Sequence, residues 1–203
     1  MNPLIFVLAT FPHSGNNWIR NLFELSTGIG TEAVYPEYGV WSNRSHSFGH
    51  SCGNDGGRRH RRKHGHKICE LIHRPEPYEP VIVKTHWPTF GISPEQVKYF
   101  DEDLNGIILT VRQPDDWCKR YLVSDFNQPY KTMDECIPAM KKRFQKHNDW
   151  WINRYPFIPI HIYNYTLMTK DQDYTRECLD ELFDLTGAQE IRDPFAWYPG
   201  NDW

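Results

Sequence analysis

The chain has 203 residues, a formal net charge of -3 and a pI near 6.4. This length suits one α/β domain with its own core and is short for two, so we expect a single domain over residues 1–203. The charge is not that of a polycation, which argues against nucleic acid as a partner and confines any attraction for anions to a local patch. No apolar run in the sequence approaches the length of a membrane span.

The number and spacing of the cysteines indicate the redox state of the cellular compartment. The five cysteines are scattered, odd in number and without a CxxC pair: Cys52, Cys69, Cys118, Cys136 and Cys178. This pattern is typical of free thiols in a reducing compartment. The apolar run near the N-terminus lacks a preceding basic region and leads directly into a glycine turn, so we interpret it as a core strand rather than a signal peptide. We therefore expect a cytoplasmic protein.

The first unit of the chain runs over residues 4–25. It consists of an apolar strand at 4–9, a turn with Pro12, Ser14 and Gly15, and a helix whose apolar face begins at Trp18. A strand that passes through a glycine turn into a helix directs unpaired N–H groups and the positive end of the helix dipole at one spot, which suits a phosphate. The loop is not a Walker A sequence, because no Lys-Ser/Thr follows the glycine. A corner without any ligand remains the alternative.

Residues 42–67 differ in composition from the rest of the chain, because Ser, Gly, His and Arg dominate and apolar residues nearly vanish. Such a segment cannot bury enough apolar surface to order itself, so we expect a disordered insertion. The basic run at 58–64 leaves open a role as an electrostatic arm for an acidic glycan. Zinc binding by the clustered histidines and cysteines is also open, but the spacings match no familiar zinc module and we predict no metal site.

The remaining elements alternate between strands and helices. Residues 81–83 and 107–111 read as short buried strands, and residues 158–163 as a strand whose Pro159 favours an edge position. Capping patterns at Ser93 and Thr132 predict helices from 94 and 133, and Gly187 ends a helix expected over 173–186. The alternation predicts an α/β fold with three layers: a mostly parallel sheet of four to five strands flanked by helices, with a P-loop-like phosphate-binding loop.

Polar residues follow two of these strands, at the edge where open α/β sheets bind ligands. The first group is Lys84-Thr85-His86-Trp87-Pro88 and the second is Arg112-Gln113-Pro114-Asp115-Asp116. Together with the loop Pro12-His13-Ser14-Gly15-Asn16-Asn17-Trp18, they resemble, in the same order, the motifs of the sulfotransferases that use 3'-phosphoadenosine 5'-phosphosulfate (PAPS). The Lys-Thr-His-x-Pro segment is similar to that of the cytosolic type. The resemblance covers residues 11–116.

The resemblance implies an enzyme that moves a sulfuryl group from PAPS to a hydroxyl acceptor by in-line transfer, without a metal, and releases 3',5'-bisphosphoadenosine (PAP). His86 matches the family's catalytic base, a role that suits an imidazole titrating near neutrality. Lys84 lies two residues earlier, hence on the same strand face, and would contact the phosphosulfate oxygens. His13 stands where the family has Lys or Arg, so it would stabilise the leaving phosphate only when protonated, which nearby phosphates would favour.

The resemblance also implies a nucleotide site. The loop would hold the 5'-phosphate, Arg112 would make a forked contact with the 3'-phosphate, and Trp18 would either stack on adenine or belong to the helix core. Pro114 and Asp116 are expected to shape and cap the following helix. The predicted nucleotide-binding set is Pro12, His13, Ser14, Gly15, Asn16, Asn17, Trp18, Arg112, Arg120 and Tyr163.

Three further departures from the family pattern concern the nucleotide. Arg120 replaces the serine expected eight residues after the motif's arginine, and it would either pair with the 3'-phosphate or face solvent. Tyr163-Asn164-Tyr165 stands in place of Tyr-Glu-Asp, which weakens Tyr163 as an adenine contact. The family's Arg-Lys-Gly and Gly-Asp-Trp are reduced to residues 199–203, so weaker nucleotide binding is open.

Two other functions stay open at this stage. A P-loop kinase is disfavoured by the missing Walker lysine, and a non-catalytic nucleotide- or glycan-binding protein would explain the departures from the motifs. For the acceptor we expect a small molecule or a glycan. A supply of aromatic residues suits a sugar or a flat phenol, and the basic insertion favours an acidic carbohydrate; these residues are Tyr35, Tyr38, Trp41, Trp87 and Phe90.

Overall fold

The computed structural model of this chain describes residues 4–12, 14–33, 78–86, 88, 104–123 and 129–196. Several sequence features lie outside these residues: His13, the aromatic residues offered for the acceptor, the basic segment 42–67, the helix expected from 94, and the tail from 197.

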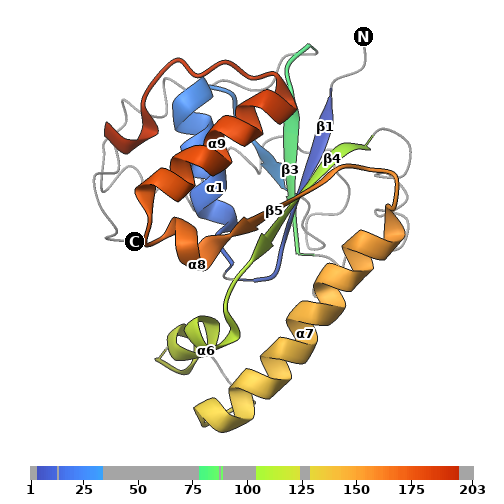
Figure 1. Ribbon diagram of the computed structural model, residues 1–203, viewed down its shortest axis with the longest axis vertical. Helices are drawn as coiled ribbons and strands as arrows, with labels where there is room; N and C mark the ends of the chain where they lie inside the picture. Colours follow the sequence, from blue (N-terminus) through green and yellow to red (C-terminus); the bar gives the residue numbers. More distant parts are fainter. Residues whose placement is uncertain are drawn as a thin grey trace.

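The centre of the molecule is a five-stranded parallel sheet with the strand order β2-β3-β1-β4-β5 (Figure 1). Every recorded strand pair in it is parallel, and β5 is an edge strand. The prediction of a mostly parallel sheet of four to five strands is confirmed. The strands are β1 Ile5–Thr10, β2 Glu32–Ala33, β3 Val81–Thr85, β4 Leu104–Val111 and β5 Ile160–Asn164.

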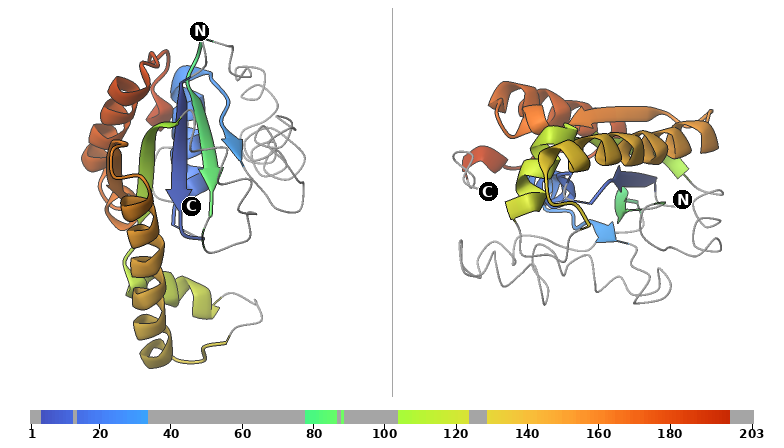
Figure 2. Two further views of the ribbon diagram at one scale, coloured as in Figure 1. Left: turned by 90° about the vertical axis from the view of Figure 1, so that its right-hand side faces the viewer. Right: turned by 90° about the horizontal axis from the view of Figure 1, so that it is seen from below.

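Helices cover both faces of the sheet, which gives the predicted three layers (Figures 1 and 2). On one face lie α1 (Asn16–Thr27) and α9 (Gln172–Thr186), and on the other lies α7 (Met133–Arg154). Alternation along the strands separates the two cores. Phe6 and Leu8 pack with α1 and α9, whereas Val7 and Ala9 pack with Trp151 of α7. Among the described residues, no helix has both the length and the apolar character needed to cross a bilayer.

Capping contacts confirm the expected start of α7 and the expected end of α9. The side chain of Thr132 accepts a hydrogen bond from the backbone N–H of Glu135, at 3.3 Å, and so caps α7. Gly187 ends α9 in the left-handed conformation. The sequence did not predict the two-residue strand β2, the one-turn helix α8 (Tyr165–Met168) or the 3₁₀ turn η3 (Pro194–Ala196).

A disulfide joins α6 (Pro114–Val123) to the N-terminal part of α7 beyond the C-terminal end of the sheet, and it corrects the sequence prediction of free thiols. Cys118 of α6 is bonded to Cys136 of α7, with their Cα atoms 6.0 Å apart. Both half-cystines are buried with Trp117 and Phe144 in the core between these helices. Because disulfides persist mainly in oxidising compartments, this bond removes the cysteine pattern as a ground for the cytoplasmic expectation. Cys178 is a buried free thiol.

Candidate functional site

The three predicted motif segments leave the sheet side by side. Strand β1, which leads into the glycine loop, lies between β3 and β4. In the register Leu8 pairs with Lys84 on one side, and Thr10 pairs with Thr110 on the other. Because parallel strands end at the same edge, the glycine loop therefore lies between the segment with Lys84 and His86 and the segment that begins at Arg112.

The glycine loop has the geometry of an anion-binding turn. The N–H of Ser14 bonds to the carbonyl of Phe11 at 3.0 Å, and Gly15 then turns the chain with φ 91° into the N-terminus of α1. The first intrahelical bond runs from the N–H of Ile19 to the carbonyl of Gly15. The N-cap makes no side-chain hydrogen bond, and no acidic residue in the first turn offsets the positive end of the helix.

Two aromatic side chains from the second half of the chain hold this loop. The ring of Tyr165 packs directly over Gly15, where an added Cβ would overlap it. The indole N–H of Trp117 donates to the carbonyl of Pro12 at 2.7 Å. The conformation of the loop therefore depends on α6 and α8 as well as on its own sequence.

The hydrogen bonding of His86 defines its tautomer. Its Nδ1 lies 2.8 Å from the carbonyl oxygen of Thr10 and 3.0 Å from the hydroxyl of the same residue. A carbonyl oxygen only accepts hydrogen bonds, so Nδ1 carries the proton and the basic lone pair of the neutral ring belongs to Nε2. The ring is half-buried. Lys84, which is only 3% exposed, precedes it on β3.

Arg112 is held from two sides at the end of β4. Its Nε donates to a carboxylate oxygen of Asp116 at 2.8 Å, and its guanidinium carbon lies 5.3 Å from the centre of the Tyr165 ring. The side chain is only 6% exposed. Pro114 opens α6 and Asp116 lies in its first turn, as expected of residues that shape this helix. Pro114 also lines the cavity described below. The hydrogen bond from Arg112 to Asp116 also fixes the orientation of the arginine side chain.

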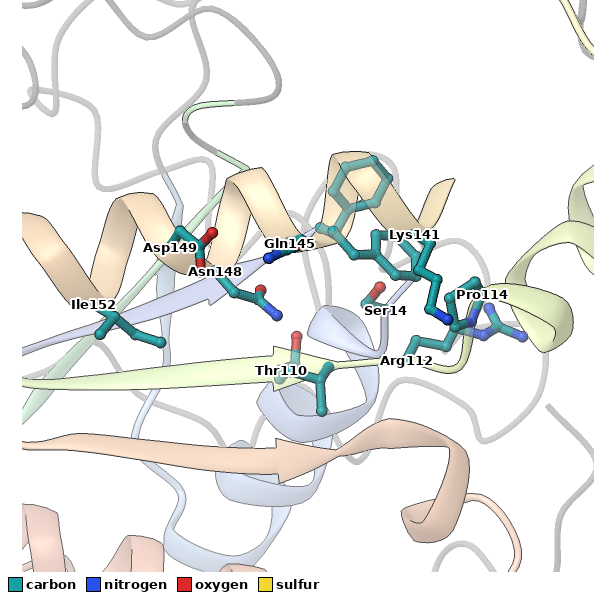
Figure 3. Close-up of a pocket in the computed structure, with 12 residues that line it drawn as sticks. Ser14, Thr110, Arg112, Pro114, Lys141, Gln145, Asn148, Asp149 and Ile152 are labelled. Carbon is teal, nitrogen blue, oxygen red and sulfur yellow. The ribbon is translucent and has the colours of Figure 1, made fainter. Parts of the chain in front are cut away.

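A cavity of about 470 Å³ opens between the end of β4, the glycine loop and α7 (Figure 3). From the sheet side it is lined by Ser14, Thr110 and Arg112, and from α7 by Lys141, Gln145, Asn148 and Asp149. Apolar walls come from Phe11, Val111, Phe144 and Ile152. The hydroxyls of Ser14 and Thr110 are buried and have no hydrogen-bond partner among the described residues. Since buried hydroxyls normally form hydrogen bonds, these two are suited to bind a polar ligand.

Some of the predicted nucleotide-binding residues do not line this cavity. Trp18 is 8% exposed and belongs to the core between the sheet and α9, which fits the core alternative for this residue. Tyr163 is 1% exposed in the same core, and burial raises its pKa. Arg120 is an exposed residue in the last turn of α6. Asn16 and Asn17 begin α1, and His13 is outside the described residues.

Sequence reasoning missed the contribution of α7 and of Tyr165. The signal from α7 was weak: Lys141, Gln145 and Asp149 recur at four-residue spacing and so share one face of the helix, but the same pattern is typical of a solvated face. No local pattern pairs Tyr165 with Gly15, because the two residues are 150 positions apart. No group of three or more potential metal ligands occurs within the part of the chain that the structure describes.

Comparison with known sequences gives short matches. No protein-family model matches the chain. WSCD family members from Drosophila pseudoobscura pseudoobscura and Drosophila melanogaster are similar to it, with 46% identity over 39 residues and 47% over 38 residues. Each match takes in 19% of this chain and 12% of the relative, so the chain corresponds to a small part of these relatives.

Comparison with solved structures covers nearly the whole chain. The sulfotransferase domain from the curacin biosynthetic pathway superimposes with a TM-score of 0.54 and 14% identity, over 98% of this chain and 79% of that one. A sulfotransferase from Alicyclobacillus acidocaldarius gives a TM-score of 0.50 and 12% identity, over 96% of this chain and 84% of that one. Identities this low show the fold alone. The chain has the fold of these sulfotransferases.

Proposed function

We propose that this protein is a sulfotransferase that moves a sulfuryl group from PAPS to a hydroxyl acceptor. The observation that carries the proposal is the bond from His86 Nδ1 to the carbonyl of Thr10, beside the glycine loop, which leaves Nε2 as the basic nitrogen. Sulfotransferases among the structural neighbours support the reaction class. The resemblance of the motif residues to those of PAPS-dependent sulfotransferases supports the donor and the site that we propose.

In the proposed reaction the acceptor oxygen attacks the sulfur atom in line with the departing phosphate. The bond from sulfur to the bridging oxygen breaks, a bond from sulfur to the acceptor oxygen forms, and PAP leaves with the electron pair. His86 Nε2 takes the proton of the acceptor hydroxyl. Lys84 lies on the strand that delivers His86 and stabilises the charge on the transferring group. No covalent intermediate and no metal enters this proposal.

The residues present fit a bound nucleotide. The uncapped N-terminus of α1 suits the 5'-phosphate, the unpartnered hydroxyl of Ser14 adds a donor, and the braced guanidinium of Arg112 suits a second phosphate. The proposed set is Pro12, His13, Ser14, Gly15, Asn16, Asn17 and Arg112. We leave Trp18, Tyr163 and Arg120 out of it, since the first two are core residues and the third is solvent-exposed.

His13 has a proposed role that a variant can test. Close to phosphates its imidazole would be held protonated, and raising the pH would then slow turnover as the cation is lost. In a His13→Lys variant we expect this alkaline decline to weaken, because a lysine keeps its charge in that range. An unchanged rate and an unchanged pH profile in the variant would refute the role.

The proposal is tested by single-turnover transfer from labelled PAPS to a panel of sugar, glycan and phenol hydroxyls. We expect transfer by the wild type and a loss of about 10²–10⁴-fold in His86→Asn. His161→Asn is the matched control, because His161 contacts Glu181 away from the glycine loop. PAP binding without any transfer would favour the non-catalytic alternative, and magnesium-dependent turnover of ATP would favour a kinase.

A further inference from the structure

One end of the cavity between β4 and α7 carries two cations. Lys141 reaches it from α7 and Arg112 from the end of β4, and in Figure 3 both side chains lie toward the same end, with Ser14 nearby. Arg112 is neutralised in part by Asp116. Lys141 forms no ion pair with any residue that the structure describes.

The rest of the cavity has the opposite character. Asp149 lies eight residues beyond Lys141 on α7, which corresponds to about 12 Å along the helix. It lines the cavity together with the amide of Asn148 and the side chain of Ile152. The cavity is therefore polarised, with positive charge beside the glycine loop and the carboxylate of Asp149 toward the other end.

The position of the cavity separates it from the proposed base. Neither Lys84 nor His86 lines it. In the sheet, β1 separates β3, which leads to His86, from β4, which leads to Arg112. Ser14 of the glycine loop and Arg112, which both belong to the proposed nucleotide-binding set, do line the cavity, so the cavity forms part of the proposed donor site. Its volume of about 470 Å³ is in the range of small-molecule sites.

We propose that Lys141 is a specificity-determining residue for the donor, and that it makes the cavity select nucleotides that carry a second phosphate in addition to the 5'-phosphate. This inference rests on the proposed function. The buried hydroxyls of Ser14 and Thr110, which lack partners in the described part of the chain, line the same cavity and provide neutral donors beside the two cations. Asn148 and Asp149 are placed to accept hydrogen bonds from the nucleoside.

The test is calorimetry of PAP and of 5'-adenosine monophosphate with the wild type and three variants. In Lys141→Met we expect about a tenfold loss of PAP affinity and less than a twofold change for the monophosphate, because only PAP has a phosphate for this lysine. Lys141→Arg should retain most of the preference. Lys142→Met is the matched control, since Lys142 is exposed on the same helix but does not line the cavity, and it should behave as the wild type.

The outcomes separate this inference from the proposed function. If the wild type prefers PAP and Lys141→Met keeps the full preference, the role of Lys141 is overturned while the proposed function stands. If Lys141→Met weakens the binding of both nucleotides equally, the lysine contributes general electrostatic attraction for phosphates. It does not then discriminate between the two nucleotides, and the inference is again overturned. If the wild type binds neither nucleotide, the proposed function itself fails.

Discussion

The indole nitrogen of Trp117 and the carbonyl oxygen of Pro12 are 2.7 Å apart, so α6 holds the glycine loop through the loop's own backbone. Trp117 also packs edge-on against Phe11, the residue after β1, with ring centres 6.1 Å apart. The loop that we assign to the 5'-phosphate is thereby coupled to the helix that begins next to Arg112.

Replacing Trp117 with Phe keeps much of the packing but leaves the carbonyl of Pro12 without its donor. We expect unfolding stability to fall by about 1–2 kcal/mol and PAP affinity to fall by about threefold to tenfold as the loop loses its position. Urea unfolding and calorimetry measure the two effects. Trp150→Phe is the control for affinity, because Trp150 packs against Trp151 on the other core. Unchanged affinity in Trp117→Phe would show that the loop needs no such support.

A Gly15→Ala substitution should be far more costly than the same change at Gly187. Both glycines have positive φ, 91° and 69°, so both variants carry backbone strain of about 1 kcal/mol. At Gly15 the new methyl group also overlaps the ring of Tyr165, whereas at Gly187 no atom lies within 4 Å. We expect a loss of about 2–4 kcal/mol for Gly15→Ala, as strain and overpacking add. Equal losses in the two variants, measured by urea unfolding, would contradict the packing of Tyr165 on Gly15.

The disulfide between Cys118 and Cys136 closes a loop of 18 residues, and such a closure contributes about 3 kcal/mol of stability. We expect a Cys118→Ser, Cys136→Ser double variant to unfold at lower urea concentration by a corresponding amount and to be insensitive to reductant. The wild type should lose the same stability when it is reduced. A Cys178→Ser variant should keep the full sensitivity to reductant. Thiol titration that finds Cys118 and Cys136 free in unreduced protein would exclude the bond.

The buried thiol of Cys178 gives a pH dependence whose sign follows from its environment. Burial, with smaller contributions from the charges of Glu181 and Glu177, raises the pKa of Cys178 from 9.0 to about 11. Between these values the unfolded chain has lost the thiol proton while the folded protein keeps it, so the unfolded state binds fewer protons and stability falls as pH rises. Below pH 9 the thiol is protonated in both states and makes no such contribution.

The expected slope from this group is at most about 1.4 kcal/mol per pH unit between pH 9 and 11. Urea unfolding across this range, compared between the wild type and Cys178→Ala, isolates it: the variant should have the shallower decline. Parallel declines in the two proteins would mean that the thiol titrates alike in the folded and unfolded states.

Much of the fold could be predicted from local patterns. Capping residues such as Thr132 and Gly187 act over three or four residues, so the sequence predicts the ends of α7 and α9 well. The strand ends at Lys84 and Arg112 were predicted to lie at one edge because parallel strands require it. Elements as short as β2 and α8 contain too few residues to show a period, and they were missed for that reason.

The missed parts of the site depend on tertiary packing. Cys118 and Cys136 meet because α6 packs against α7, and the spacing of cysteines in the sequence carries no information about that contact. Lys141 reaches the cavity only because the N-terminal part of α7 extends to the same end of the sheet as Arg112. The sequence alone shows an exposed lysine on a helix, which is the ordinary place for one.

The ring of Tyr165 over Gly15 also has a consequence for the order of events during synthesis. The glycine loop leaves the ribosome early, but the side chain that covers it arrives 150 residues later. At translation speeds of about 5–20 residues per second, Tyr165 is synthesised roughly 8–30 seconds after Gly15. The nascent protein should therefore acquire tight nucleotide binding only after α8 has emerged from the ribosome. We expect this even if the strands and helix of its N-terminal half have already folded.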